Sequence, residues 1–173
     1  MKNNKVRKTL ILAIFTAAAL IIFLVEAQIP VIIAVPGIKL GLSNIIVLIT
    51  LYFYGRKEAA AVLALKIILG SVFSGQLMSF LYSAAGGLLC LVVMALFKKL
   101  ISEKQMWAIS AFGATAFNAG QLTAAILILN SIQLIWYGPV LLISAVVTGV
   151  FTGICAQLVL PRLRKALKDG SRK

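Results

Sequence analysis

The sequence alternates between long runs of apolar residues and short clusters of basic ones. This alternation limits the possible folds more than any single motif does. An α-helix needs roughly 20 apolar residues to cross the hydrocarbon core of a membrane, and several runs approach that length. The composition agrees, because 62% of the residues are hydrophobic and only 12% are charged, whereas soluble domains average about 25% charged residues. We therefore predict an all-α integral membrane protein.

Six apolar segments are expected to form transmembrane helices, joined by short turns and without a separate soluble domain. They run approximately from Thr9 to Glu26, Gly41 to Tyr54, Glu58 to Leu69 or a little beyond, the end of the Gly70–Gln76 turn to Phe97, Met106 to Leu129, and Pro139 to Leu160. Residues 1–173 then form a single domain with basic tails at 1–8 and 162–173. The first segment follows several lysines, as in a signal peptide. It has no small-residue cleavage site near its end, so we interpret it as a retained span.

Basic residues are concentrated in alternate loops. The N-terminal tail, the turn at Arg56, the turn at Lys98 and the C-terminal tail hold all but two of the 17 lysines and arginines. Cytoplasmic loops carry an excess of Lys and Arg, so both chain ends are expected in the cytoplasm. The net charge of +13 thus arises from loop clusters rather than from an amphipathic face, and nucleic acid is not expected as a partner.

A few polar residues interrupt the apolar segments or stand at their ends, and these are the candidate substrate-binding residues. They are Lys39, Asn44, Lys66, Gln76, Asn118 and Gln121. A charge at the centre of a bilayer costs at least about 2.5 to 3.5 kcal/mol, so Lys66 should face protein or water. With both termini in the cytoplasm, this set lies in the outward half of the protein. Two lysines with several amides there favour an anionic or zwitterionic small molecule, and the apolar surroundings favour an amphiphile.

Each candidate also has a purely structural interpretation. Lys66 could extend to an interface or form an ion pair with Glu26. Lys39 could be a solvated loop charge. Asn118 and Gln121 are three residues apart and therefore on one face of a helix, where they could form interhelical hydrogen bonds instead of ligand contacts.

Catalytic, cofactor and metal sites are not expected. The chain has four scattered acidic residues and no histidine. No carboxylate pair is therefore spaced to hold magnesium on a diphosphate, and the usual zinc, haem and histidine-based sites cannot form. Gly-x-Ser-x-Gly and Walker A motifs are absent, so active transport would need a partner that hydrolyses ATP. Cys90 and Cys155 lie within apolar segments and are expected to be small buried residues.

The first predicted helix carries small residues at a regular spacing. Ala13 and Ala17 are four residues apart, a pattern that lets another helix approach closely in lipid. Both packing within the chain and docking of a partner subunit are consistent with it.

Three motifs resemble those of a known family. They are Pro36–Asn44 (PGIKLGLSN), Lys66 followed by Leu69–Ser71 (LGS) and Phe73–Gly75 (FSG), and Asn118–Gln121 (NAGQ). Over almost its whole length the chain resembles the heptaprenyl diphosphate synthase component I family, also called the Gx transporter family. That family is similar in size and six-helix layout to the substrate-binding components of energy-coupling factor transporters.

The resemblance implies a component that captures a vitamin or related micronutrient from outside and docks on a shared transmembrane subunit with two ATPases. Ala13 and Ala17 would mediate docking, and the loop that contains Lys39 would cap the ligand. The synthase name implies an alternative, a non-catalytic membrane subunit of heptaprenyl diphosphate synthase in isoprenoid or menaquinone metabolism. Prenyl synthases use aspartate-rich magnesium motifs, whereas the single Asp of this chain lies in its tail, so neither interpretation makes the chain an enzyme.

Overall fold

The computed structural model describes residues 2–28, 39–75 and 77–169, and every regular element in these ranges is helical. The helices are α1 (Lys2–Glu26), α2 (Asn44–Phe53), α3 (Arg56–Ser74), α4 (Leu77–Phe97), η1 (Glu103–Gln105), α5 (Met106–Leu129), η2 (Ile132–Tyr137) and α6 (Gly138–Asp169). The all-α prediction is confirmed, and the six predicted helical segments correspond to α1–α6.

Four of the helices contain segments that are long and apolar enough to cross a membrane. These segments are Lys5–Glu26, Leu77–Phe97, Glu103–Leu129 and Ile132–Leu167. The chain is therefore a multi-pass membrane protein. The other two predicted spans differ from these four: α2 has only 10 residues, about 15 Å of helix, and α3 contains four charged residues.

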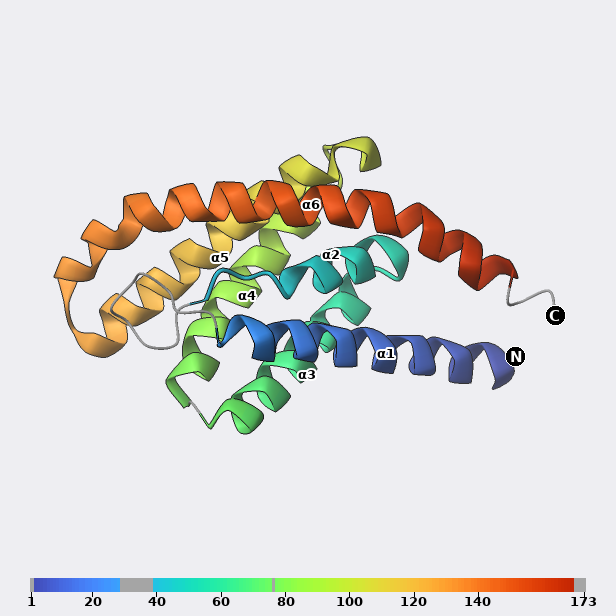
Figure 1. The fold of residues 1–173 in the computed structure, drawn as a ribbon, viewed down its shortest axis with the longest axis horizontal. Coiled ribbons are helices and arrows are strands. Elements are labelled where there is room, and N and C mark those ends of the chain that lie inside the picture. The colour runs from blue at the N-terminus through green and yellow to red at the C-terminus, as the bar shows by residue number, and fades with distance from the viewer. Residues whose placement is uncertain (1, 29–38, 76, 170–173) are drawn as a thin grey trace.

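The short helix α2 lies at the centre of the bundle. It contacts each of the other five α-helices, and Val47, Leu48 and Leu51 in it are almost completely buried. Around it, α5 packs against α4 and α6, and α1 packs against α3. Figure 1 shows both termini at one end of the bundle, with the α2–α3 turn, while the link between α5 and α6 lies at the opposite end. The basic clusters of the sequence thus gather at one end.

Both ends of the chain are more helical than the sequence analysis predicts. Helix α1 begins at Lys2 instead of Thr9, and α6 continues past Pro161 to Asp169 instead of ending at Leu160. Proline removes one helical hydrogen bond and crowds the preceding turn. Contacts on both sides of Pro161 hold the helix together, because Leu160 is fully buried and Leu163 packs against the hydrophobic core.

Polar contacts fix the same terminal segments. Arg164 on α6 forms an ion pair with Glu103, with 2.7 Å between Nη1 and Oε1, and the Arg7 side chain donates a hydrogen bond to the carbonyl oxygen of Leu167. Lys8 forms an ion pair with Glu58 at the start of α3. Over residues 2–8 and 162–169 the predicted basic tails are therefore helical extensions of the bundle.

Helix α3 also extends beyond its predicted end. It includes Gly70 and Ser71 and ends at Ser74, where Gly75 adopts a left-handed conformation with φ of 65°. Such a residue is a common helix terminator because glycine has no Cβ to clash there. Of the turn expected from Gly70 onward, Gly70–Ser74 are helical, and Gly70 packs against the Phe23 ring of α1.

Glycines bring α4 and α5 unusually close together. A Cβ atom added to Gly120 would lie 2.8 Å from the carbonyl oxygen of Ala85 and 2.8 Å from the Cα atom of Gly86. Backbone atoms cannot rotate away as a side chain can. The α4–α5 contact therefore depends on the absence of a side chain at Gly120.

Gly120→Ala is expected to destabilise the protein, because overpacking of a tight contact typically costs about 1–3 kcal/mol. The matched control is Gly138→Ala, where the new Cβ would lie 3.7 Å from the nearest atom, Cδ2 of Leu122, and alanine favours the helix. Thermal unfolding in mild detergent should show a lower Tm only for Gly120→Ala. Equal Tm values for the two variants would contradict the close backbone packing.

Candidate functional site

Lys66, in the middle of α3, forms hydrogen bonds with residues at the start of α2. Its side chain is 2% exposed, and its Nζ lies 2.9 Å from Oγ of Ser43 and 2.7 Å from Oδ1 of Asn44. Asn44 is the first residue of α2, and Ser43 immediately precedes it. The prediction that Lys66 faces protein instead of lipid is confirmed.

Glu26 links the end of α1 to the backbone that precedes α2. Its carboxylate accepts a hydrogen bond from the N–H of Gly41 and a longer one, 3.4 Å, from the N–H of Ser43. Among the residues that the structure describes, the ion pairs are Lys8–Glu58 and Arg164–Glu103. The suggested ion pair between Lys66 and Glu26 is therefore not formed, because Glu26 is directed to backbone donors and Lys66 to Ser43 and Asn44.

Lys39 is buried as well, with 3% exposure, so its interpretation as a solvated loop charge is wrong. Its Nζ lies 3.4 Å from the centroid of the Phe23 ring, a geometry in which the ring face attracts the ammonium group. Burial lowers the pKa of Lys39 to about 8, and the negative charge of Glu26 limits this shift.

Two glycines of the sequence motifs make room for this arrangement. A Cβ atom at Gly70 would lie 2.4 Å from the ring of Phe23, so the missing side chain provides the space for the ring that contacts Lys39. Gly41 has a φ of 81°, and its Cβ would lie 2.8 Å from the ring of Phe117 on α5. Both glycines thus make room for aromatic rings, and one of these rings, that of Phe23, contacts Lys39.

The structure directs Asn118 and Gln121 to different neighbours. Gln121 is fully buried, and its Oε1 accepts a hydrogen bond from the backbone N–H of Lys39 at 3.1 Å. Asn118 donates from Nδ2 to the carbonyl oxygen of Leu141 on α6 at 2.9 Å. Gln121 therefore joins the group around Lys39, whereas Asn118 links α5 to α6. Gln76 lies outside the described residues.

The buried group contains several hydrogen-bond donors that find no partner in the described part of the chain. Among the described residues, Nζ of Lys39, Nδ2 of Asn44 and Nε2 of Gln121 have no hydrogen-bond partner. The oxygen of each amide is already occupied, by Lys66 in one case and by the N–H of Lys39 in the other. This network fixes which amide atom is the nitrogen.

Unpaired buried donors are energetically unfavourable, at about 1–3 kcal/mol each. Three of them, together with the positive charges of Lys39 and Lys66, form a site that suits hydrogen-bond acceptors and negative charge. We call Glu26, Lys39, Ser43, Asn44, Lys66 and Gln121 the buried polar cluster. The sequence analysis names four of these as site residues. Glu26 and Ser43 complete the group. Glu26 accepts a hydrogen bond from the backbone of Ser43, and the Ser43 side chain accepts one from Lys66, so both contacts join residues that are far apart in the sequence.

A scan against protein families matches residues 15–159 to the description "Heptaprenyl diphosphate synthase component I". The chain belongs to this family. The matched range includes the whole buried polar cluster and all three motifs that carry the resemblance. Comparisons with curated proteins and with solved structures found no match.

The predicted docking residues of this component I family member are accessible on the outside of the bundle. Ala13 and Ala17 on α1 are exposed. They line a groove of about 480 Å³ between α1 and α3, together with Thr16, Leu65 and Leu69. The described helices of the chain do not cover this face.

Glu26→Ala is expected to increase hydrogen exchange at the amides of Gly41 and Ser43 at least about tenfold, since hydrogen bonds to charged groups contribute about 1.5–3 kcal/mol. Hydrogen–deuterium exchange of the detergent-solubilised protein measures this directly. Glu58→Ala is the matched control, because it removes a carboxylate that pairs with Lys8 instead. Unchanged protection at both amides in Glu26→Ala would show that Glu26 does not hold this segment.

Proposed function

We propose that the chain is the membrane-embedded substrate-capture subunit of an energy-coupling factor type importer, which binds an anionic or zwitterionic small molecule from the external side. The proposal depends on the buried donors of Lys39, Asn44 and Gln121, which have no partner among the residues that the structure describes. A ligand with several acceptor oxygens would complete these hydrogen bonds at once. Membership of the component I family is consistent with this role.

The charges of the buried polar cluster favour a ligand that is negative at the contact point. Lys39 and Lys66 contribute two positive charges and Glu26 one negative charge, so the cluster carries an excess positive charge when all three are ionised. A buried excess charge is unfavourable unless it is paired. A bound carboxylate or phosphate would supply the missing partner.

The position of the cluster supports capture from outside. Lys66 contacts the N-terminal end of α2, whereas the basic turn at Arg56 follows the C-terminal end of the same helix. If the basic end faces the cytoplasm, as the positive-inside rule predicts, the cluster lies in the outward half. The exposed groove at Ala13 and Ala17 supports docking of a coupling subunit, since small residues let a partner helix approach closely.

The family description favours a second candidate, a non-catalytic membrane subunit of heptaprenyl diphosphate synthase. In that role the same donors would bind the phosphate of a polyprenyl lipid. The identity of the co-purifying protein separates the two candidates, because an importer subunit would bring a transmembrane coupling protein with ATPases and an accessory subunit would bring a prenyl synthase.

Lys39→Met is expected to weaken ligand binding at least about tenfold while leaving thermal stability without ligand equal or higher. The opposite signs arise because the substitution removes a buried charge without a hydrogen-bond partner among the described residues but also removes a charged donor to the ligand. Native mass spectrometry of the protein purified from its own membranes in mild detergent measures ligand occupancy, and a thermal scan measures Tm.

The matched control is Lys99→Met, an exposed residue at the basic end, which should retain full ligand occupancy. Full occupancy in Lys39→Met would refute the assignment of Lys39 to the ligand site. Equal loss in both variants would mean that the effect is not specific to the buried polar cluster.

Replacing both Ala13 and Ala17 by Leu is expected to abolish co-purification of the coupling subunit while leaving ligand occupancy unchanged, because the added side chains fill the α1–α3 groove and prevent close approach. Ala119→Leu is the control. It places the same substitution at an exposed position in a groove of about 420 Å³ between α5 and α6. Assembly that survives the double substitution would contradict docking at this face.

A further inference from the structure

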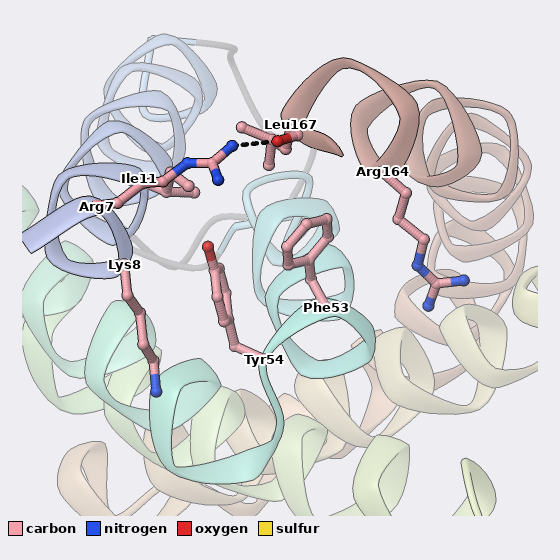
Figure 2. Close-up of a pocket in the computed structure, with 7 residues that line it drawn as sticks. All are labelled: Arg7, Lys8, Ile11, Phe53, Tyr54, Arg164 and Leu167. Atoms are coloured by element: carbon pink, nitrogen blue, oxygen red, sulfur yellow. Dashed lines mark hydrogen bonds between the residues drawn. The ribbon is translucent and has the colours of Figure 1, made fainter. Parts of the chain in front are cut away.

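A cavity of about 390 Å³ lies at the end of α2 opposite to the buried polar cluster (Figure 2). It is formed by α1, by the C-terminal end of α2 and by the last turns of α6. Its lining residues are Arg7, Lys8, Ile11, Phe53, Tyr54, Arg164 and Leu167. Most of them lie outside residues 15–159, the range that matches the component I family.

The cavity lies where two membrane-crossing segments end. The apolar segment in α1 begins at Lys5, and the one in α6 ends at Leu167, so Arg7 and Leu167 lie within about one helical turn of these limits. This is the depth of lipid headgroups, where an apolar span meets charged residues. The cavity also belongs to the basic end of the bundle, which the positive-inside rule places at the cytoplasmic leaflet.

The described residues neutralise only some of the charged groups that line the cavity. Lys8 and Arg164 are paired with Glu58 and Glu103. Arg7 has no carboxylate partner among the described residues, and its one described hydrogen bond is to the carbonyl oxygen of Leu167. Its side chain extends from α1 toward the carbonyl oxygen of Leu167 on α6 (Figure 2). Further N–H groups of Arg7 are thus available for an acceptor.

Tyr54 adds a hydroxyl group beside this guanidinium. Figure 2 shows its side chain pointing into the cavity, with the hydroxyl directed toward α1 near Arg7 and Ile11. Within the described part of the chain, no hydrogen bond satisfies this hydroxyl. The remaining walls are apolar, formed by Ile11, the Phe53 ring and Leu167. The cavity therefore combines the guanidinium group of Arg7 and the hydroxyl group of Tyr54 with an adjoining apolar surface.

We propose that this cavity binds the phosphate of an anionic phospholipid, with Arg7 and Tyr54 donating hydrogen bonds to the phosphate oxygens and an acyl chain lying along Ile11, Phe53 and Leu167. The planar guanidinium matches phosphate geometry. Basic pockets between transmembrane helices on the cytoplasmic side are typical sites for anionic headgroups. A free phosphate ion would use the polar groups but would gain nothing from the apolar wall.

The test uses the full-length protein in a neutral detergent, titrated with short-chain phosphatidylglycerol, with phosphatidylcholine of the same chain length, and with inorganic phosphate. Native mass spectrometry counts bound lipid, and thermal shift gives the affinity of each probe. The wild-type protein is expected to bind one phosphatidylglycerol tightly. Stabilisation by inorganic phosphate alone to the same extent, or equal affinity for phosphatidylcholine, would overturn the proposal.

Arg7→Gln is expected to lower the affinity for phosphatidylglycerol about tenfold, because a charge-assisted hydrogen bond is lost. Arg162→Gln removes the same charge from an exposed position at the same end of the bundle and should bind as the wild type does. Equal loss in the two variants would show only diffuse attraction between a basic surface and an anionic lipid, and would overturn the site.

Arg7 also contacts Leu167, so a second variant separates binding from folding. Tyr54→Phe keeps the ring packing and removes only the hydroxyl. It should retain the Tm of the lipid-free protein and lose about threefold or more in affinity for phosphatidylglycerol, because one hydrogen bond to the headgroup disappears. Unchanged affinity in Tyr54→Phe would refute the proposed headgroup position.

Discussion

The architecture depends on how three buried charges are accommodated in an interior that is otherwise mainly apolar. Glu26, Lys39 and Lys66 are each at most 3% exposed, and isolated charges in such surroundings are strongly unfavourable. The protein gives each charge a different partner: backbone N–H groups for Glu26, the Phe23 ring for Lys39, and the side chains of Ser43 and Asn44 for Lys66. As a result, α1, α2 and α3 meet at the buried polar cluster.

This constraint explains why the short helix α2 lies at the centre. Its first residue receives a hydrogen bond from Lys66 and the turn before it binds Glu26, so its N-terminal end is held inside the bundle. Two aromatic rings from α1 and α5 occupy the space that Gly70 and Gly41 leave open. The motif residues therefore depend on one another. The glycines leave space for the two rings, and one of these rings contacts Lys39. Within the residues that the structure describes, the same arrangement leaves donors on Lys39, Asn44 and Gln121 without partners.

The local pattern of apolar and polar residues in the sequence predicts the helices but not all of their ends. Met106–Leu129 is predicted with the bounds that the structure has, because an apolar run there is bounded by polar turns. The continuation of α6 past Pro161 depends on Leu163 and Arg164 finding partners elsewhere in the fold, which no local rule reveals. Asn118 and Gln121 illustrate a second limit: residues three apart are about 60° apart around the helix axis, enough to reach two different neighbours.

The central claim is that the buried polar cluster binds an acceptor-rich ligand. A high-resolution experimental structure of the protein purified from its own membranes, with its ligand retained, tests this most directly. The account predicts ligand oxygen atoms within about 3 Å of Nζ of Lys39, Nδ2 of Asn44 and Nε2 of Gln121. A ligand bound elsewhere, with these three nitrogens bonded only to protein or water, would contradict it.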